Sequence, residues 1–374
     1  MDNQARNLSF DFFRGVAVLM IIVLHAAMTT PGISLINNFL FDFVSRLSTG
    51  MQLFFVLSGY FIYQSMQRLS NNNAGVKIFL YKRMAKILPL YLLFLFLNIT
   101  LFFVFSELYN DFSGFHLNAV TSSDVNLNNI FLHIFMLQGF VPEYIHSLVD
   151  GSWSIVTEVY FYLLFPVIIF PFLNSLKKSI VVFMIILVSS MYFIPYIAPI
   201  IWPDQGEFYY YFFLNQLPVF ILGVVMSHLI NKKQEGVKEY SDILFAFSIV
   251  LFFGLISGSN YPLAYHYLYG IVFVLMITGA YPYMESFKGF FLFSAVVRLG
   301  KQAYAIFLSH LLVMQPSSYL LKLYAPNLNI AEFFLIQLLS ILVCSYILSN
   351  YLFNRIDVFI VNAMNNYIRR NYVT

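Results

Sequence analysis

The sequence predicts an all-α fold, a polytopic membrane helix bundle of about ten transmembrane helices with both termini in the cytoplasm. Of its 374 residues, 60% are hydrophobic and 10% are charged, and the mean hydropathy is +0.78. The apolar residues form runs of roughly 20, which is the length of a helix that crosses a bilayer, whereas porin strands would show short alternating segments. Lysines and arginines gather between alternate runs. These observations predict a single integral-membrane domain over residues 1–374.

The expected spans follow one another along the chain, at 9–29, 39–63, 78–105, 153–173, 179–201, 209–230, 241–258, 263–283, 299–320 and 331–353. An even number of spans puts both termini on one side, and almost all basic residues fall on that side, which the positive-inside rule identifies as cytoplasmic. Only Arg46 and Lys322 are expected at the outer face. The first span has no clear cleavage site, so we expect it to stay in the mature protein.

The composition also argues against several kinds of ligand. The net charge is +3, and the basic residues form short clusters between apolar runs, so we expect no nucleic-acid partner. The only cysteine is Cys344, which rules out an intramolecular disulfide and a multi-cysteine metal site. We expect no bound metal. The sequence leaves the oligomeric state open.

The first span contains two polar residues that are unusual inside a membrane, Arg14 and His25. They are eleven positions apart, and eleven helical steps turn the chain through roughly 1100° and raise it by about 16 Å, so both side chains point the same way. Burying them costs several kcal/mol unless they line a polar cavity. The pair therefore predicts one wall of an active site, with Arg14 toward the cytoplasm and His25 toward the outside.

The second span holds the run Gly50–Gly59. Its small residues favour close packing between helices. Its polar side chains, Gln52 and Ser58, are the ones that could alternatively line the cavity.

The third span begins with a basic group, Lys82, Arg83 and Lys86. Arg83 and Lys86 are one helical turn apart on one face, a spacing suited to phosphate groups. The alternative is that this cluster only fixes the topology, as basic residues do at many cytoplasmic helix ends.

The longest stretch between spans, 106–152, contains no lysine or arginine and is expected to face outward. Within it, 128–138 is long enough for an interfacial helix and too short to cross the membrane. The next span opens from the outer side with Trp153–Pro166, which places Glu158 at a depth similar to that of His25. A carboxylate bonded to one imidazole nitrogen leaves the other nitrogen free as a base. Alternatively, Glu158 pairs with a basic residue or is solvated.

The ninth span places His310 near the middle of the membrane. One interpretation makes it a hydrogen-bonded core residue, and the other makes it part of the substrate site. A lone histidine does not distinguish the two.

At these residues the chain resembles the membrane-bound acyltransferase type 3 family, the O-acyltransferases of bacterial surface glycans. Ordered blocks over nearly the whole chain carry the resemblance. They are Arg14-Gly15 with His25, Phe54–Gly59, Arg83-x-x-Lys86 before Pro89, Trp153–Pro166, and Leu299–His310.

The chain also departs from the family pattern. Lys86 replaces a second arginine and so lacks the planar fork that binds phosphate at two points. Val156 and Val159 stand where the family usually has a serine and a second carboxylate, and Ala303 and Phe307 replace a serine and a tyrosine. We expect no fused SGNH-type or other soluble domain.

The resemblance implies transfer of an acyl group, with acetyl as the first expectation, from cytoplasmic acyl-coenzyme A to a hydroxyl of a cell-surface or lipid-linked glycan. Acetyl-CoA would be a donor substrate, with no cofactor bound permanently, and the protein would lie in the inner membrane of a bacterium. The expected catalytic residues are His25, Glu158 and Arg14. The expected donor-binding residues are Arg14, Arg83, Lys86 and Lys82. The expected substrate contacts are Trp153, Ser154, Tyr162, His310, Gln52 and Ser58.

Several alternatives stay open at this point. His25 either deprotonates the acceptor hydroxyl or first takes the acyl group itself. A polytopic transporter or flippase for a glycan or a small substrate would also bury Arg14 and His25, although the chain lacks an obvious pair of broken helices in matching halves. A non-catalytic sensor with the same fold is the third candidate. The acceptor glycan is open, with O-antigen, capsule, exopolysaccharide and peptidoglycan all compatible.

Overall fold

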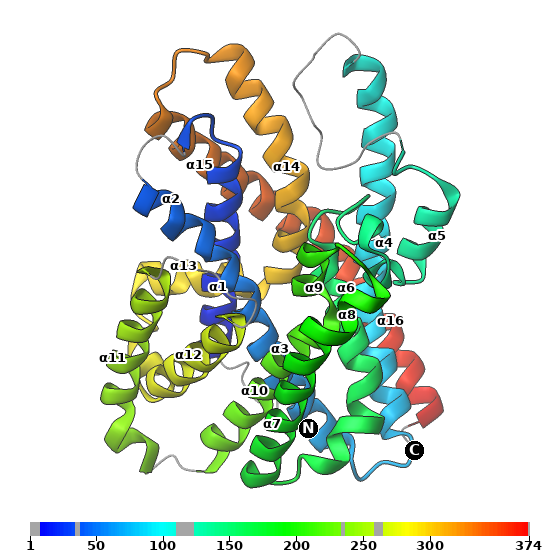
Figure 1. Ribbon diagram of the computed structural model, residues 1–374, viewed down its shortest axis with the longest axis vertical. Helices are drawn as coiled ribbons and strands as arrows, with labels where there is room; N and C mark the ends of the chain where they lie inside the picture. Colours follow the sequence, from blue (N-terminus) through cyan, green and yellow to red (C-terminus); the bar gives the residue numbers. More distant parts are fainter. Residues whose placement is uncertain (1–7, 34–37, 110–122, 233–235, 258–264, 373–374) are drawn as a thin grey trace.

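The computed structural model describes residues 8–33, 38–109, 123–232, 236–257 and 265–372, and within these ranges it contains helices and no strands (Figure 1). The helices are α1 (Leu8–Met28), α2 (Asn38–Ser45), α3 (Gly50–Leu69), α4 (Gly75–Tyr109), α5 (Leu127–Ile134), α6 (Ser152–Leu164), α7 (Leu176–Tyr192), α8 (Ala198–Ile201), α9 (Gly206–Tyr211), α10 (Phe213–Lys232), α11 (Gly236–Ser257), α12 (Tyr265–Ala280), α13 (Phe291–Lys301), α14 (Ala303–Tyr324), α15 (Ile330–Leu348) and α16 (Asn354–Tyr372).

The predicted membrane helix bundle is confirmed. Within the described part of the chain, seven helical stretches are long and apolar enough to cross a bilayer, and an eighth is possible if α13 and α14 form one bent span. The seven are Leu8–Met28, Gly75–Phe103, Ser152–Phe172, Leu176–Ile201, Gly206–Ile230, Tyr265–Phe287 and Ile330–Tyr372. The total of ten spans stays a prediction, as does the cytoplasmic placement of both termini.

The other three predicted spans are broken or shortened in the structure. The stretch 39–63 is divided by a short 3₁₀ helix, Arg46–Thr49, into α2 and α3. The stretch 241–258 belongs to α11, whose apolar part, Tyr240–Ile256, is short for a span. The stretch 299–320 is broken where α13 meets α14 at an angle of 84°, because Gln302 leaves the helical conformation between them.

Arg46 lies at the first of these breaks. Its side chain is 6% exposed, and its Nη1 donates to the carbonyl oxygens of Leu255 and Ile256 at the end of α11; its expected place at the outer face stays a prediction. A guanidinium group there satisfies carbonyls that have no partner within their own helix and complements the negative end of the helix dipole. Arg46 therefore links the segment between α2 and α3 to the end of α11.

The segment before α6, which is expected to face outward, is held together by buried polar groups. The expected helix at 128–138 is α5, Leu127–Ile134, which is too short to cross a bilayer. His133 is fully buried, with its ring nitrogens 2.8 Å from the Tyr91 hydroxyl and 3.2 Å from the Ser147 hydroxyl. Burial lowers the pKa of His133 to about 4, so the ring is neutral near pH 7. Residues 110–122 of the expected outer loop lie outside the described residues.

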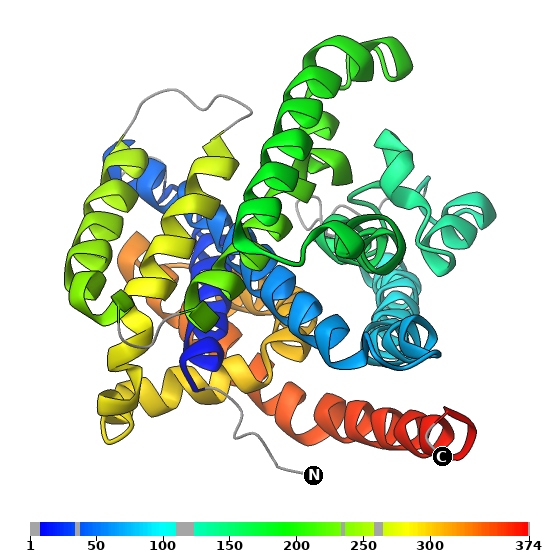
Figure 2. The same ribbon diagram turned by 90° about the horizontal axis from the view of Figure 1, so that it is seen from below.

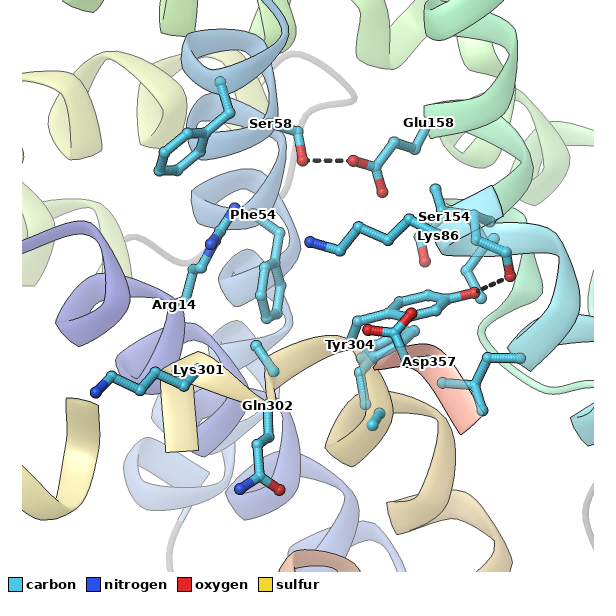
Figure 3. Close-up of a pocket in the computed structure, with 18 of the residues that line it drawn as sticks. Arg14, Phe54, Ser58, Lys86, Ser154, Glu158, Lys301, Gln302, Tyr304 and Asp357 are labelled. Atoms are coloured by element: carbon cyan, nitrogen blue, oxygen red, sulfur yellow. Dashed lines mark hydrogen bonds between the residues drawn. The ribbon is translucent and has the colours of Figure 1, made fainter. Parts of the chain in front are cut away.

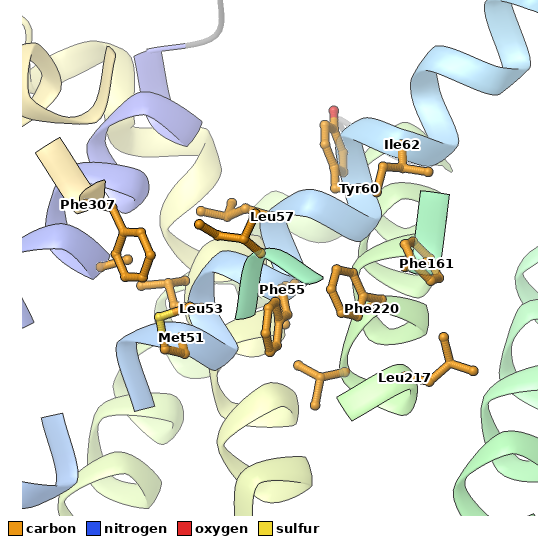
Figure 4. Close-up of a cluster of buried hydrophobic side chains, with 14 of the residues drawn as sticks. Met51, Leu53, Phe55, Leu57, Tyr60, Ile62, Phe161, Leu217, Phe220 and Phe307 are labelled. Carbon is orange, nitrogen blue, oxygen red and sulfur yellow. The ribbon is translucent and has the colours of Figure 1, made fainter. Parts of the chain in front are cut away.

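The core centres on α3, which α10 and α6 cover with stacked aromatic rings (Figure 4). The Phe220 ring lies 4.5 Å from that of Phe55 and 4.4 Å from that of Phe161, centroid to centroid. Helices α3 and α10 approach closely because glycines face the partner backbone on both sides. A Cβ on Gly59 would overlap the Phe220 carbonyl, and a Cβ on Gly223 would overlap the Val56 carbonyl. The predicted small-residue packing of the second span is confirmed at Gly59.

We expect Gly223→Ala to lower the thermal unfolding midpoint by ~5 °C or more in detergent, because the added methyl group must push α3 and α10 apart. The matched control is Gly254→Ala in α11, where an added Cβ meets nothing within 4 Å; it should leave the midpoint within about 2 °C. Thermal unfolding followed by tryptophan fluorescence measures both. Equal midpoints for the two variants would contradict the proposed role of this contact.

Candidate active site

A polar cavity of about 490 Å³ lies between α1, α3, α4, α6, the α13–α14 junction and α16 (Figure 3). The residues that sequence analysis singled out and that line it are Arg14, Ser58, Arg83, Lys86, Ser154, Glu158 and Tyr162. These come from four helices that are far apart in the sequence. The bundle therefore brings together the basic group of the third span and the buried arginine of the first.

Close packing between α1 and α13 positions the Arg14 side of this cavity. A Cβ on Gly300 would overlap the Asp11 carbonyl, and a Cβ on Gly15 would overlap the Val296 carbonyl. This contact brings the α13–α14 junction, with Lys301, to the cavity beside Arg14. Neither glycine leaves room for a side chain.

The cavity has an excess of positive charge. Four basic residues line it, Arg14, Arg83, Lys86 and Lys301, against two acidic residues, Glu158 and Asp357. Lys86 extends from α4 into the space between Arg14 and Glu158 (Figure 3). This balance favours an anionic ligand.

Two of the basic side chains are held in place by their neighbours. The Arg14 side chain is 21% exposed, with Nη1 3.6 Å from Asp11 Oδ1, and its guanidinium carbon lies 4.2 Å from the centre of the Phe61 ring. Arg83 donates from Nη2 to the Phe61 carbonyl at 3.1 Å and lies 5.5 Å from the centre of the Tyr162 ring. Ordered guanidinium groups lose less entropy on binding a phosphate than free ones.

Glu158 lies inside the cavity with a fixed carboxylate. The hydroxyl groups of Ser58 and Tyr162 each donate to its Oε1 at 2.6 Å. Its helix, α6, begins after Gly151, which adopts a left-handed conformation with φ of 71°. The expected hydrogen bond between Glu158 and His25 is not made, because the helix rotation directs the carboxylate toward α3 and the cavity.

The partner of His25 is His310 instead. The two rings are nearly parallel, with centroids 5.0 Å apart, and His25 Nδ1 lies 2.8 Å from His310 Nε2. His310 is fully buried, and its Nδ1 donates to the Phe307 carbonyl oxygen at 2.6 Å. Phe307 also lines the cavity, and its ring lies 5.6 Å from that of His310, so the histidine pair adjoins the cavity without lining it.

A family model described as an acyltransferase domain matches residues 7–349. The chain belongs to the acyltransferase 3 family. It is therefore a multi-pass membrane acyltransferase. No curated protein and no solved structure matches the chain in the two other comparisons.

The remaining expected residues of this acyltransferase lie outside the cavity. Gln52 is fully buried, and its Nε2 donates to the Tyr210 hydroxyl at 3.2 Å and to Gln216 Oε1 at 3.3 Å. The Trp153 ring packs against Tyr211, with centroids 4.9 Å apart. Lys82 is exposed on α4 and is not part of the cavity lining. The expected substrate and donor residues are thus not gathered at a single site.

Sequence reasoning missed some residues of the cavity. Tyr304 and Lys301 line it at the α13–α14 junction, and the Tyr304 hydroxyl donates to the Ile87 carbonyl at 2.9 Å. Asn354 and Asp357 line it from α16, which packs against α4 (Figure 2). Helix α16 follows the last expected span and lies beyond the region that the family model matches. The sequence signal that could have revealed α16 is the helical spacing of apolar residues from Val358 to Ile368, which alternate with polar and charged residues.

Proposed function

We propose that this acyltransferase moves an acyl group, acetyl in the first instance, from cytoplasmic acyl-CoA to a hydroxyl of a cell-surface or lipid-linked glycan in a bacterial inner membrane. The observation that carries the proposal is the positively charged cavity inside a protein of an acyltransferase family. Acyl-CoA is a soluble polyanion. A cavity with four basic side chains suits it better than it suits a neutral donor.

In this proposal the donor's phosphate groups bind Arg14, Arg83 and Lys86. The two arginines supply planar forks for phosphate oxygens, and Lys86 supplies a mobile point charge. The pantetheine arm then extends along the cavity toward Phe307 and the histidine pair. Ser58 and Tyr162 hold one oxygen of Glu158, which leaves the other for a hydroxyl or amide N–H group of a bound substrate.

The reaction that we assign to His25 uses its Nε2 atom. Nε2 accepts the proton of the sugar hydroxyl while the hydroxyl oxygen attacks the thioester carbonyl carbon. The C–S bond breaks, and the departing thiolate takes the proton from His25. The products are a sugar ester and free CoA. In the alternative route Nε2 attacks the thioester carbonyl and expels the CoA thiolate. The sugar hydroxyl then attacks the acyl group and displaces the imidazole, and its proton goes to the thiolate. The same nitrogen reacts in both routes.

The test is acceptor-dependent release of free thiol. Purified protein in lipid vesicles is given acetyl-CoA with or without de-esterified surface glycan, and thiol is measured alongside ester formed on the glycan. We expect the two products to appear in equal amounts. Movement of glycan across the vesicle membrane without any thiol release would instead support the transporter alternative.

A further inference from the structure

We infer that His310 is a positioning residue that fixes the tautomer of His25 and stabilises its protonated form during transfer. This inference rests on the proposed function of His25. It concerns the nitrogen atoms of the two rings, which lie on α1 and α14. The hydrogen bonds of the two rings determine which ring nitrogens carry protons.

The Phe307 carbonyl oxygen can only accept a hydrogen bond. His310 Nδ1 lies 2.6 Å from this oxygen and must therefore carry the proton. In a neutral imidazole the second nitrogen is then an acceptor. His310 is fully buried, and burial without a contacting carboxylate favours the neutral ring.

The tautomer of His25 follows from that of His310. His310 Nε2, an acceptor, lies 2.8 Å from His25 Nδ1, so His25 Nδ1 carries the proton and donates it. His25 Nε2 is then left with a free lone pair. This is the nitrogen that a general base or an acyl-accepting nucleophile needs.

The same chain of hydrogen bonds supports the charge that develops in the reaction. When Nε2 takes a proton, His25 becomes an imidazolium ion, and its Nδ1–H bond to His310 becomes a charge-assisted bond. His310 in turn is polarised by its own bond to the Phe307 carbonyl. A neutral ring thus takes the place that sequence analysis assigned to the carboxylate of Glu158.

Two near-isosteric variants separate the two bonds that His310 makes. In His310→Gln the amide lies where Nε2 lies in histidine, so its oxygen accepts from His25 Nδ1 while the bond to Phe307 is lost. In His310→Asn the amide lies where Nδ1 lies, so the bond to Phe307 is kept and the acceptor for His25 is lost. A structural role for His310 would not favour glutamine over asparagine.

We expect kcat to fall by less than ~10-fold in His310→Gln and by about 100-fold or more in His310→Asn and His310→Leu. The KM for acetyl-CoA should stay within about twofold in all three, because His310 does not line the cavity. Nitrogen NMR of ¹⁵N-histidine-labelled protein in membranes gives a readout that needs no activity. The His25 signals, identified by their loss in His25→Gln, should report a protonated Nδ1 in the native protein and a mixture of tautomers in His310→Asn.

The outcomes separate the two proposals. A native protein that forms no ester and releases no thiol would overturn the proposed function. A native protein that is active, with His310→Asn at least as active as His310→Gln or with the His25 tautomer unchanged in His310→Asn, would overturn the positioning role alone.

Discussion

Acyl transfer is expected to fall by at least ~1,000-fold when His25 is replaced by alanine, while the protein still folds and inserts. The variant loses His25 Nε2, the one nitrogen of the His25–His310 pair whose lone pair the two hydrogen bonds leave free. Water in its place is a far weaker base and cannot carry an acyl group. The measurement is the initial rate of acceptor-dependent thiol release at saturating acetyl-CoA.

The control for this variant is Met28→Ala, one turn further along α1. The Met28 side chain is 69% exposed, so its loss should change neither the rate nor the unfolding midpoint. Full activity in His25→Ala would exclude His25 from the chemistry. A labelled acyl group trapped on His25 of the native protein without acceptor would assign the covalent route; direct transfer leaves the histidine unlabelled.

The second large effect is expected for Lys86→Glu, which should raise the KM for acetyl-CoA by roughly 30-fold or more and leave the KM for the glycan nearly unchanged. The substitution changes the cavity from four basic and two acidic residues to three of each. It also places a carboxylate where Lys86 extends between Arg14 and Glu158 (Figure 3). The donor's phosphates would then meet repulsion instead of attraction.

Lys82→Glu is the matched control, with the same charge change one turn earlier in α4. Lys82 is exposed and does not line the cavity, so its KM for acetyl-CoA should change by less than about threefold. Similar effects of both variants would indicate that this basic cluster acts only through topology or long-range charge. An unchanged donor KM in Lys86→Glu would remove the cavity from donor binding altogether.

The sequence predicts the bundle well, because hydropathy reports directly on which segments a bilayer accepts. It also predicts that Arg14 and Arg83 share a ligand, since both lie at the basic ends of their helices. Depth along a helix follows from residue number at 1.5 Å per residue. For this reason the expected cavity residues on α1 and α4 are found together.

The sequence does not show how each helix is rotated about its axis, and so does not show which neighbouring helix a given side chain faces. Glu158 and His25 were expected to meet because their depths are similar, yet Glu158 is bonded to Ser58 and Tyr162. The partner of His25 depends on the packing of α1 against α14, which residue number alone does not give. The break at Gln302 comes two residues after Gly300, which packs against the Asp11 backbone. The apolar run 299–320 continues through this break without a signal in the sequence.

Helix α16 completes the cavity from outside the region that the family model matches. The family model ends at residue 349, so the shared core supplies the arginines, Glu158 and the histidine pair, whereas Asn354 and Asp357 come from outside it. The two parts are joined by the packing of α16 on α4. Substitutions at Asn354 and Asp357 are therefore expected to change the shape and charge of the cavity without altering any residue of the matched region.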